Sequence, residues 1–149
     1  MAYFVTGATG FIGRYLVANL LRRGEPVYVL VRKGSQKKLA ALREHWGADE
    51  KQVIAVVGDL SKERMGVADA DIRKLKGKVK HLFHLAAVYD LSASAEDQQL
   101  ANVEGTRNAV RYAEAISAGC VHHVSSIAAA GTRPTGQASG PRFSTSWLT

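Results

Sequence analysis

The chain of 149 residues alternates between short apolar runs and segments whose apolar residues recur with helical spacing. Short runs with few polar interruptions are typical of strands buried on both faces of a parallel sheet. Such runs occur at residues 3–5, 27–31, 53–57, 81–85 and 121–124. Helical spacing predicts helices between them, at residues 11–23, after Ser35, at 69–75 and at 96–118.

This alternation predicts an α/β fold, a Rossmann doubly wound parallel sheet with five strands in the order 3-2-1-4-5. We expect Gly24 to end the first helix and Ser35 to cap the second. The last helix offers apolar side chains for packing at Leu100, Val103, Ala109, Val110, Ala113 and Ile116. We place this domain at residues 1–130. Residues 131–149 are rich in Gly, Pro, Ser and Thr and are expected to form an irregular or disordered tail.

A glycine-rich turn joins the first strand to the first helix, with the sequence TGATGFIG at residues 6–13. A helix N-terminus presents unpaired N–H groups and a partial positive charge, and glycine lets a phosphate approach that backbone closely. Gly7, Gly10 and Gly13 therefore predict a nucleotide-binding strand–loop–helix unit. On their own, these glycines also fit a plain tight turn.

Ligands of such sheets bind at the carboxyl ends of the strands, so residues that follow each run are candidates for the site. Arg32 follows the second run, with Lys33, Ser35 and Lys37 nearby. An arginine here favours the 2′-phosphate of NADP over NAD, with a surface cation as the alternative. Asp59 follows the third run, and it either binds the amino edge of an adenine or caps the next segment.

The last two runs lead to small and hydroxyl side chains. Ala86 and Ala87 follow the fourth run, and such small residues would let a cofactor lie flat over the sheet edge. Ser125 and Ser126 follow the fifth run, where a hydroxyl could hydrogen-bond a substrate carbonyl.

Taken together, these positions resemble the extended short-chain dehydrogenase/reductase family. The matching segments are TGATGFIG (6–13), GDL (58–60), HLAA (84–87), NVEGT (102–106) and VSSIAAAG (124–131), in the family's order and spacing. The last three are most similar to the bacterial branch of fatty acyl reductases and carboxylic acid reductase-type reductase domains. The resemblance implies an NAD(P)-dependent oxidoreductase that transfers hydride between NADP(H) and a carbonyl, an alcohol or an acyl thioester.

The resemblance also implies roles for individual residues. Ser126 matches the catalytic serine, and Asn102 matches a helix asparagine that supports the proton relay. The implied cofactor-binding positions are Gly7, Thr9, Gly10, Phe11, Ile12 and Gly13 at the pyrophosphate, Arg32 and Ser35 at the 2′-phosphate, Asp59 and Leu60 at the adenine, and Leu85, Ala86, Ala87 and Ser125 on the nicotinamide side. NADP is the expected cofactor, with NAD as the alternative.

One family feature is absent from the sequence. The Tyr-x-x-x-Lys pair, in which tyrosine protonates the carbonyl oxygen and lysine lowers the tyrosine pKa, does not occur. We therefore expect the cofactor-binding N-terminal portion of a truncated reductase, with little or no turnover and a frameshift as one origin of the tail. The alternatives are a non-catalytic dinucleotide-binding module and a fragment of an NAD-dependent nucleotide-sugar epimerase or dehydratase.

The composition limits the kinds of molecule that the chain is expected to bind and the compartment in which it is expected to lie. The net charge is +7, but the basic residues are scattered without interleaved aromatic residues, so we expect a small-molecule substrate and no nucleic acid. No apolar run reaches the roughly 18 residues of a membrane span. Cys120 is the single cysteine and no leader is visible, which favours a cytoplasmic location.

Two further expectations concern the end of the sheet. His122 and His123 are adjacent in a strand and would face opposite sides, and no cluster of Cys, Asp or Glu is expected to complete a metal site. The sheet edge left uncovered after the fifth strand would favour self-association.

Overall fold

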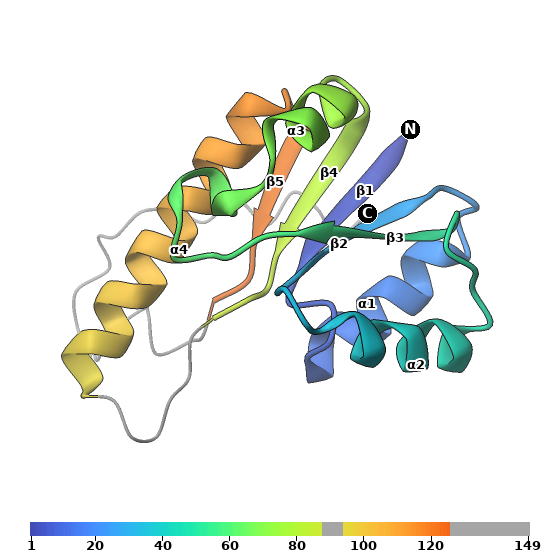
Figure 1. Cartoon of the computed structure of the whole chain (residues 1–149), viewed down its shortest axis with the longest axis horizontal. Helices are drawn as coiled ribbons and strands as arrows, with labels where there is room; N and C mark the ends of the chain where they lie inside the picture. Colours follow the sequence, from blue (N-terminus) through green and yellow to red (C-terminus); the bar gives the residue numbers. More distant parts are fainter. Residues whose placement is uncertain (88–93, 126–149) are drawn as a thin grey trace, which may run out of the picture.

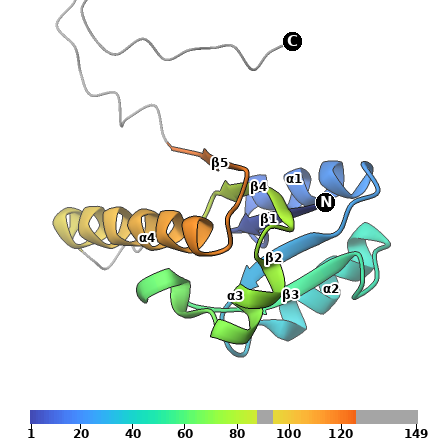
Figure 2. The ribbon, with the colours of Figure 1, turned by 90° about the horizontal axis from the view of Figure 1, so that it is seen from above.

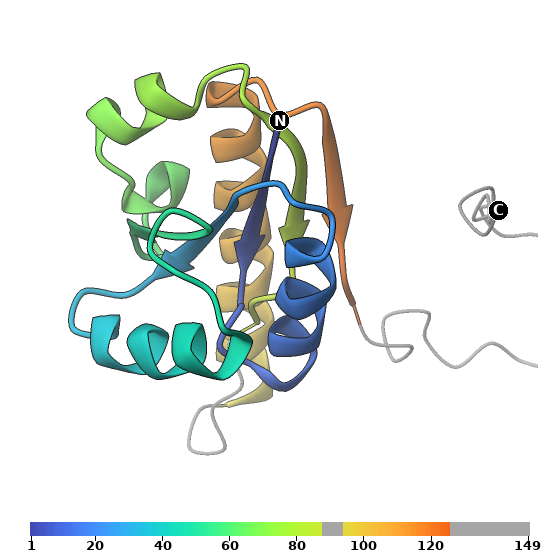
Figure 3. The ribbon, with the colours of Figure 1, turned by 90° about the vertical axis from the view of Figure 1, so that its right-hand side faces the viewer.

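Five parallel strands form one sheet in the computed structural model, which describes residues 1–87 and 94–125 (Figure 1). The strand order is β3-β2-β1-β4-β5, which confirms the predicted Rossmann topology. Figure 3 shows β5 at the edge of the sheet, next to β4. The strands are β1 (Ala2–Thr6), β2 (Val27–Val31), β3 (Val53–Val57), β4 (Val79–His84) and β5 (Cys120–His123).

Helices cover both faces of the sheet, as Figure 2 shows, with α1 and α2 on one face and α3 and α4 on the other. They are α1 (Phe11–Leu21), α2 (Gln36–Trp46), α3 (Asp69–Leu75) and α4 (Ala95–Ala115). A short 3₁₀ turn, η1 (Glu63–Gly66), follows β3 and was not predicted from the sequence. Right-handed crossovers of this kind place the carboxyl ends of all five strands at one edge.

Each face has its own hydrophobic core. On the α1/α2 face the core is aliphatic, with Val5, Val17 and Leu39 fully or almost fully buried. On the α3/α4 face it contains aromatic rings, and the Phe4 and Tyr112 ring centroids lie 4.9 Å apart. The apolar runs of the central strands are therefore buried from two sides, as their pattern predicts, whereas Val121 and Val124 of the run at 121–124 are exposed, because β5 lies at the sheet edge.

The structure departs from the expected packing at two places. Ser35 occupies the N-cap position of α2, but its side chain makes no capping hydrogen bond. Leu100, Val103 and Val110 are exposed rather than packed. The N-terminal part of α4 extends past the carboxyl ends of the strands, so it has no sheet beneath it (Figure 1).

Two further expectations can be compared only with the described part of the chain. Ser126 and the expected tail at residues 131–149 lie outside the described residues. Within the described part of the chain, no helix has both the length and the apolar character required to cross a membrane.

Candidate functional site

The glycine turn after β1 is packed backbone against backbone. Gly7 has φ +74°, and a Cβ at this position would lie 2.8 Å from the Ala86 backbone nitrogen. A Cβ at Gly13, in the first turn of α1, would lie 2.1 Å from the Gly7 carbonyl oxygen. The Gly10 N–H donates to that same oxygen at 3.0 Å. These glycines are therefore required by close approach within the protein itself, independently of any ligand.

The N-terminus of α1 is open to an anion. Gly10 is its N-cap residue, no side chain caps it, and no acidic residue lies in its first turn. Phe11 and Ile12 are exposed, at 72% and 58%. The first N–H groups of a helix lack intrahelical acceptors, so this terminus can donate to a phosphate.

A cavity of about 280 Å³ joins the glycine turn to the carboxyl end of β2. Among the described residues, its wall carries two cations, Arg32 and Lys38, and no carboxylate, so it attracts anions. The lining residues are Gly7, Thr9, Leu30, Val31, Arg32, Ser35, Lys38, Gly58, Leu60, Ala86 and Ala87.

Seven of the sequence-predicted cofactor positions line this cavity: Gly7, Thr9, Arg32, Ser35, Leu60, Ala86 and Ala87. The other described ones, Gly10, Phe11, Ile12, Gly13, Asp59, Leu85 and Ser125, lie outside its lining.

The lysine that lines the cavity near β2 is not one of those expected from the sequence. Lys38 lines the cavity, whereas Lys33 and Lys37, which the sequence analysis favoured, do not. Ser35 and Lys38 are three residues apart at the start of α2, and this spacing places them on one side of a helix. That spacing was the signal in the sequence that pointed to Lys38.

Asp59 is engaged within its own turn. Its Oδ1 accepts hydrogen bonds from the Ser61 N–H at 2.9 Å and the Ser61 hydroxyl at 2.8 Å. These bonds hold the pKa of Asp59 below its ordinary value, and Arg32 acts in the same direction. The Asp59 N–H donates to the Met65 carbonyl oxygen at 2.6 Å. The carboxylate therefore fixes its own turn, but it does not cap the next helical segment, because the N-cap residue of η1 is Lys62 and no side chain caps it. The predicted contact of Asp59 with an adenine stays a prediction.

Helix α4 supports the neighbouring part of this loop. The Asn108 side-chain amide donates to the Leu60 carbonyl oxygen at 2.9 Å. Asn108 is itself buried, and Gly105 brings the helix backbone close to Leu60, because a Cβ there would lie 3.8 Å from the Leu60 Cβ. The Leu60 wall of the cavity is thus held by a helix residue that lies 48 positions further along the chain.

A buried hydrogen-bond network lies beneath the glycine turn. His84 Nδ1 lies 2.8 Å from the Thr6 hydroxyl, and His84 Nε2 lies 3.4 Å from the Thr106 hydroxyl. Thr6 also accepts from the Ala86 N–H at 3.2 Å. Burial lowers the pKa of His84 to about 4, with a further contribution from His123. The neutral imidazole thus links the ends of β1 and β4 to the middle of α4.

This network gives a structural reason for three of the sequence segments. Thr6, His84 and Thr106 come from TGATGFIG, HLAA and NVEGT, respectively, and sequence reasoning assigned no role to any of them. His84 lies 78 positions from Thr6 and 22 positions from Thr106 in the sequence, so only the fold brings these three residues together.

The predicted catalytic positions are described only in part. Asn102 lies on α4 and is partly buried. Ser125 is exposed just beyond β5, where the Val124 N–H donates to the His84 carbonyl oxygen at 3.0 Å. This bond places Ser125 at the same sheet edge as Ala86. Ser126 lies outside the described residues.

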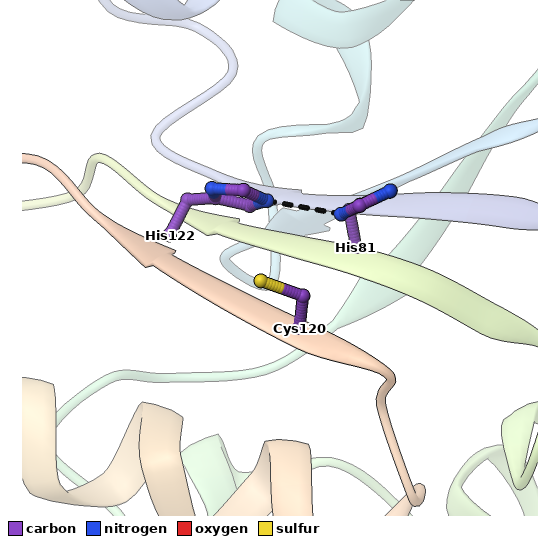
Figure 4. Close-up of side chains that lie close together, drawn as sticks. All are labelled: His81, Cys120 and His122. Carbon is purple, nitrogen blue, oxygen red and sulfur yellow. Dashed lines mark hydrogen bonds between the residues drawn. The ribbon is translucent and has the colours of Figure 1, made fainter. Parts of the chain in front are cut away.

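The histidines of β5 face opposite sides of the sheet, as predicted. His123 stacks on His84, with ring centroids 5.4 Å apart. On the other face, His122 Nε2 lies 3.0 Å from His81 Nδ1, and these atoms and the Cys120 Sγ all lie within 4.8 Å of one another (Figure 4). The expectation that no Cys cluster forms there was wrong, because strand pairing places His81 opposite Cys120.

Residues 5–143 match the model of an NAD-binding family described as male sterility protein. The chain is 36% identical over 137 residues to a putative dihydroflavonol 4-reductase of Synechocystis sp., covering 91% of the chain and 35% of that protein. It is 31% identical over 141 residues to a putative fatty acyl-CoA reductase of Drosophila melanogaster, covering 83% of the chain and 27% of that protein. The chain therefore spans about a third or less of these relatives.

A solved structure has a similar fold. The yeast methylglyoxal/isovaleraldehyde reductase Gre2, complexed with NADPH, superposes with a TM-score of 0.73 at 27% sequence identity. The match covers 87% of this chain and 38% of the yeast protein.

Proposed function

This chain is an NAD(P)-binding domain that belongs to the male sterility protein family of extended short-chain dehydrogenases/reductases, and from that premise we propose that it selects NADP(H). The observation that carries the proposal is the cavity wall beside β2, where the part of the chain that the structure describes supplies Arg32, Ser35 and Lys38 and no carboxylate. NAD-preferring sites of this fold place an acidic residue there for the ribose hydroxyls, and that residue would repel a 2′-phosphate. Two cations and a hydroxyl suit the phosphate instead.

The protein groups fit the rest of a dinucleotide. The open N-terminus of α1 and the glycine turn would hold the pyrophosphate, because both present backbone N–H groups without a capping side chain. Leu60 would contact the adenine, while Asp59 acts by fixing the turn. Ala86 and Ala87 would leave room for the nicotinamide ribose, next to Leu85 and Ser125.

The reaction that we propose for the intact protein is carbonyl or acyl-thioester reduction. Bound NADPH supplies a hydride to such a substrate. Ser126, with Ser125 as its neighbour, would hold the substrate oxygen by a hydrogen bond, and Asn102 would support the proton relay from α4. The proton donor is missing from this sequence, because none of its tyrosines has a lysine four residues later.

We therefore propose that this chain binds the cofactor without turning it over, which favours a dinucleotide-binding module as its activity in isolation. NADPH oxidation would be followed with an aldehyde and with an acyl-CoA as probes. No measurable rate above the protein-free control is expected, and a measurable rate would contradict the proposal.

Cofactor choice is tested by titrating the protein with NADPH and with NADH, following nucleotide fluorescence. Arg32→Ala is expected to weaken NADPH binding by about 10- to 100-fold and to leave NADH binding nearly unchanged, because the lost contact is with the 2′-phosphate. Lys33→Ala is the matched control, since this neighbouring cation does not line the cavity. Tighter binding of NADH than NADPH by the unmodified chain would overturn the proposal.

The proposal also covers the cellular location of the protein and its self-association. A single cysteine supports a cytoplasmic location, which is tested by localising the tagged protein. The exposed Val121 and Val124 at the β5 edge support self-association, which light scattering would detect as a mass above that of the monomer.

A further inference from the structure

We propose that His81, Cys120 and His122 form a structural Zn²⁺ site that fastens the edge strand β5 to β4. The site lies on the α1/α2 face of the sheet, and two of its residues are on β5 and one is on β4 (Figure 4). It is separate from the cofactor cavity, because none of the three residues lines that cavity.

The backbone register brings the three side chains together. His81 pairs with Cys120 across the strands, and His122 is two residues further along β5, so all three side chains leave the same face. In Figure 4 the two imidazole rings point toward each other, with the Cys120 sulfur beside them. One nitrogen of each ring and the sulfur lie within 4.8 Å of one another.

Such spacing is close to that of a metal-ligand set. Zn–N bonds of about 2.0–2.1 Å and Zn–S bonds of about 2.3 Å place neighbouring ligand atoms of a tetrahedral site about 3.3–3.7 Å apart. The His81–His122 separation of 3.0 Å is slightly shorter, and the largest separation in the cluster is no more than 4.8 Å. Small side-chain rotations are therefore sufficient to bring all three atoms onto one ion.

Aromatic neighbours hold the two imidazole rings in this arrangement. Phe83 stacks on His122, with ring centroids 4.5 Å apart and an interplanar angle of 12°. Tyr3 stacks on His81, with centroids 6.1 Å apart. Both imidazoles are thereby oriented by residues of the central strands rather than by loops, which reduces the conformational entropy lost on binding a metal.

The chemistry of the ligands favours zinc among the divalent cations. Two imidazoles and one thiol are soft or borderline ligands that suit Zn²⁺, whereas Mg²⁺ and Ca²⁺ require oxygen ligands. Lys80 and Arg23 place positive charge near His81. The negative charge of a Cys120 thiolate would offset the repulsion between these cations and the metal.

A three-residue site leaves one coordination position for water or for another group. Because the three residues are distributed over two strands, the ion would cross-link β5 to β4 and stabilise the sheet at its edge. Cobalt substitution tests the ligand set directly, because Co²⁺ bound by a thiolate gives a charge-transfer band in the near ultraviolet.

The experiment titrates the purified 149-residue chain, kept reduced with a phosphine, with Zn²⁺ and separately with Co²⁺. We expect one equivalent of Zn²⁺ to bind with a Kd of about 1 µM or tighter. Saturation should raise the Tm by about 5 °C or more. The near-ultraviolet thiolate band should appear with Co²⁺ and disappear when Zn²⁺ is added.

Three variants locate the site. Cys120→Ser and His122→Gln should each weaken Zn²⁺ binding by at least about 10-fold, and Cys120→Ser should also abolish the cobalt band. His123→Gln is the matched control, since this histidine neighbours His122 in sequence but lies on the other face of the sheet. Circular dichroism would verify that each variant is folded.

Two results would overturn the proposal. The first is the absence of stoichiometric Zn²⁺ binding to the unmodified, folded chain at about 10 µM metal. The second is zinc binding that His123→Gln weakens as much as His122→Gln does, which would indicate non-specific surface coordination.

Discussion

The two faces of the sheet receive histidines from the same two strands, β4 and β5, but place them in different surroundings. On the α3/α4 face, His84 is 2% exposed and lies between the hydroxyls of Thr6 and Thr106. On the α1/α2 face, His81 and His122 are partly exposed and contact each other. Alternation along a strand decides which face a side chain occupies, and the neighbouring side chains on that face set its chemical surroundings.

The faces also differ in how their helices approach the site. Helix α1 packs against the glycine turn through backbone atoms at Gly13, where there is no room for a side chain. Helix α4 contacts the loop after β3 through the Asn108 side chain. A Cβ added at Gly105 would lie at an ordinary van der Waals distance from the Leu60 side chain. The first contact is consequently intolerant of substitution, whereas the second can be adjusted.

The largest expected difference in stability is between alanine substitutions of two helical glycines, one on each face. Gly13→Ala places a methyl group 2.1 Å from a backbone oxygen, so it should destabilise the protein by about 3 kcal/mol and abolish NADPH binding. Gly105→Ala has its nearest contact at 3.8 Å and should stabilise by about 0.5–1 kcal/mol through helix propensity. Urea unfolding measures both, and equal effects would contradict the distinction between the faces.

Acid should act through the buried histidine of the α3/α4 face. The pKa of His84 is about 4 in the folded protein against an ordinary value of 6.5, so the unfolded chain takes up a proton below pH 6.5 that the folded chain does not. Stability should therefore fall as the pH drops from 6.5 to 4, by about 3 kcal/mol from this group.

The measurement for this prediction is urea unfolding at several pH values between 4 and 7. His84→Gln should remove about 3 kcal/mol of the pH dependence, leaving the part that comes from other groups. His45→Gln, at an exposed position on α2, should leave the dependence as it is. An unchanged slope in His84→Gln would show that His84 is not the titrating group.

The smallest expected effect concerns the aromatic core of the α3/α4 face. Among the described residues, the Tyr112 hydroxyl is buried without a hydrogen-bond partner, and burial raises its pKa. Tyr112→Phe removes this unsatisfied group and keeps the ring against Phe4, so it should stabilise by about 1 kcal/mol. Tyr15→Phe, at an exposed position, should have no effect on the urea midpoint. A loss of stability in Tyr112→Phe would show that the hydroxyl is satisfied in solution.

The glycine turn and much of the cavity lining were predictable because their signals are local in the sequence. The glycine spacing at residues 7, 10 and 13 and the position of Arg32 after an apolar run require no knowledge of distant contacts. The predicted strand at 53–57 and helix at 69–75 have the observed bounds. Lys38 was not predicted, although its helical spacing from Ser35 is equally local in the sequence.

The sequence by itself determined the strand–helix alternation and the location of the glycine turn, since both depend on periodicity or on residues that are neighbours in the chain. The strand order followed from the doubly wound topology that this alternation indicates. Only the tertiary structure decided that His84 joins Thr6 and Thr106, and that His81 lies beside Cys120 and His122. Those contacts depend on strand register and on the packing of α4. Register is fixed by the pairing of whole strands, and it cannot be read from a histidine or a cysteine alone.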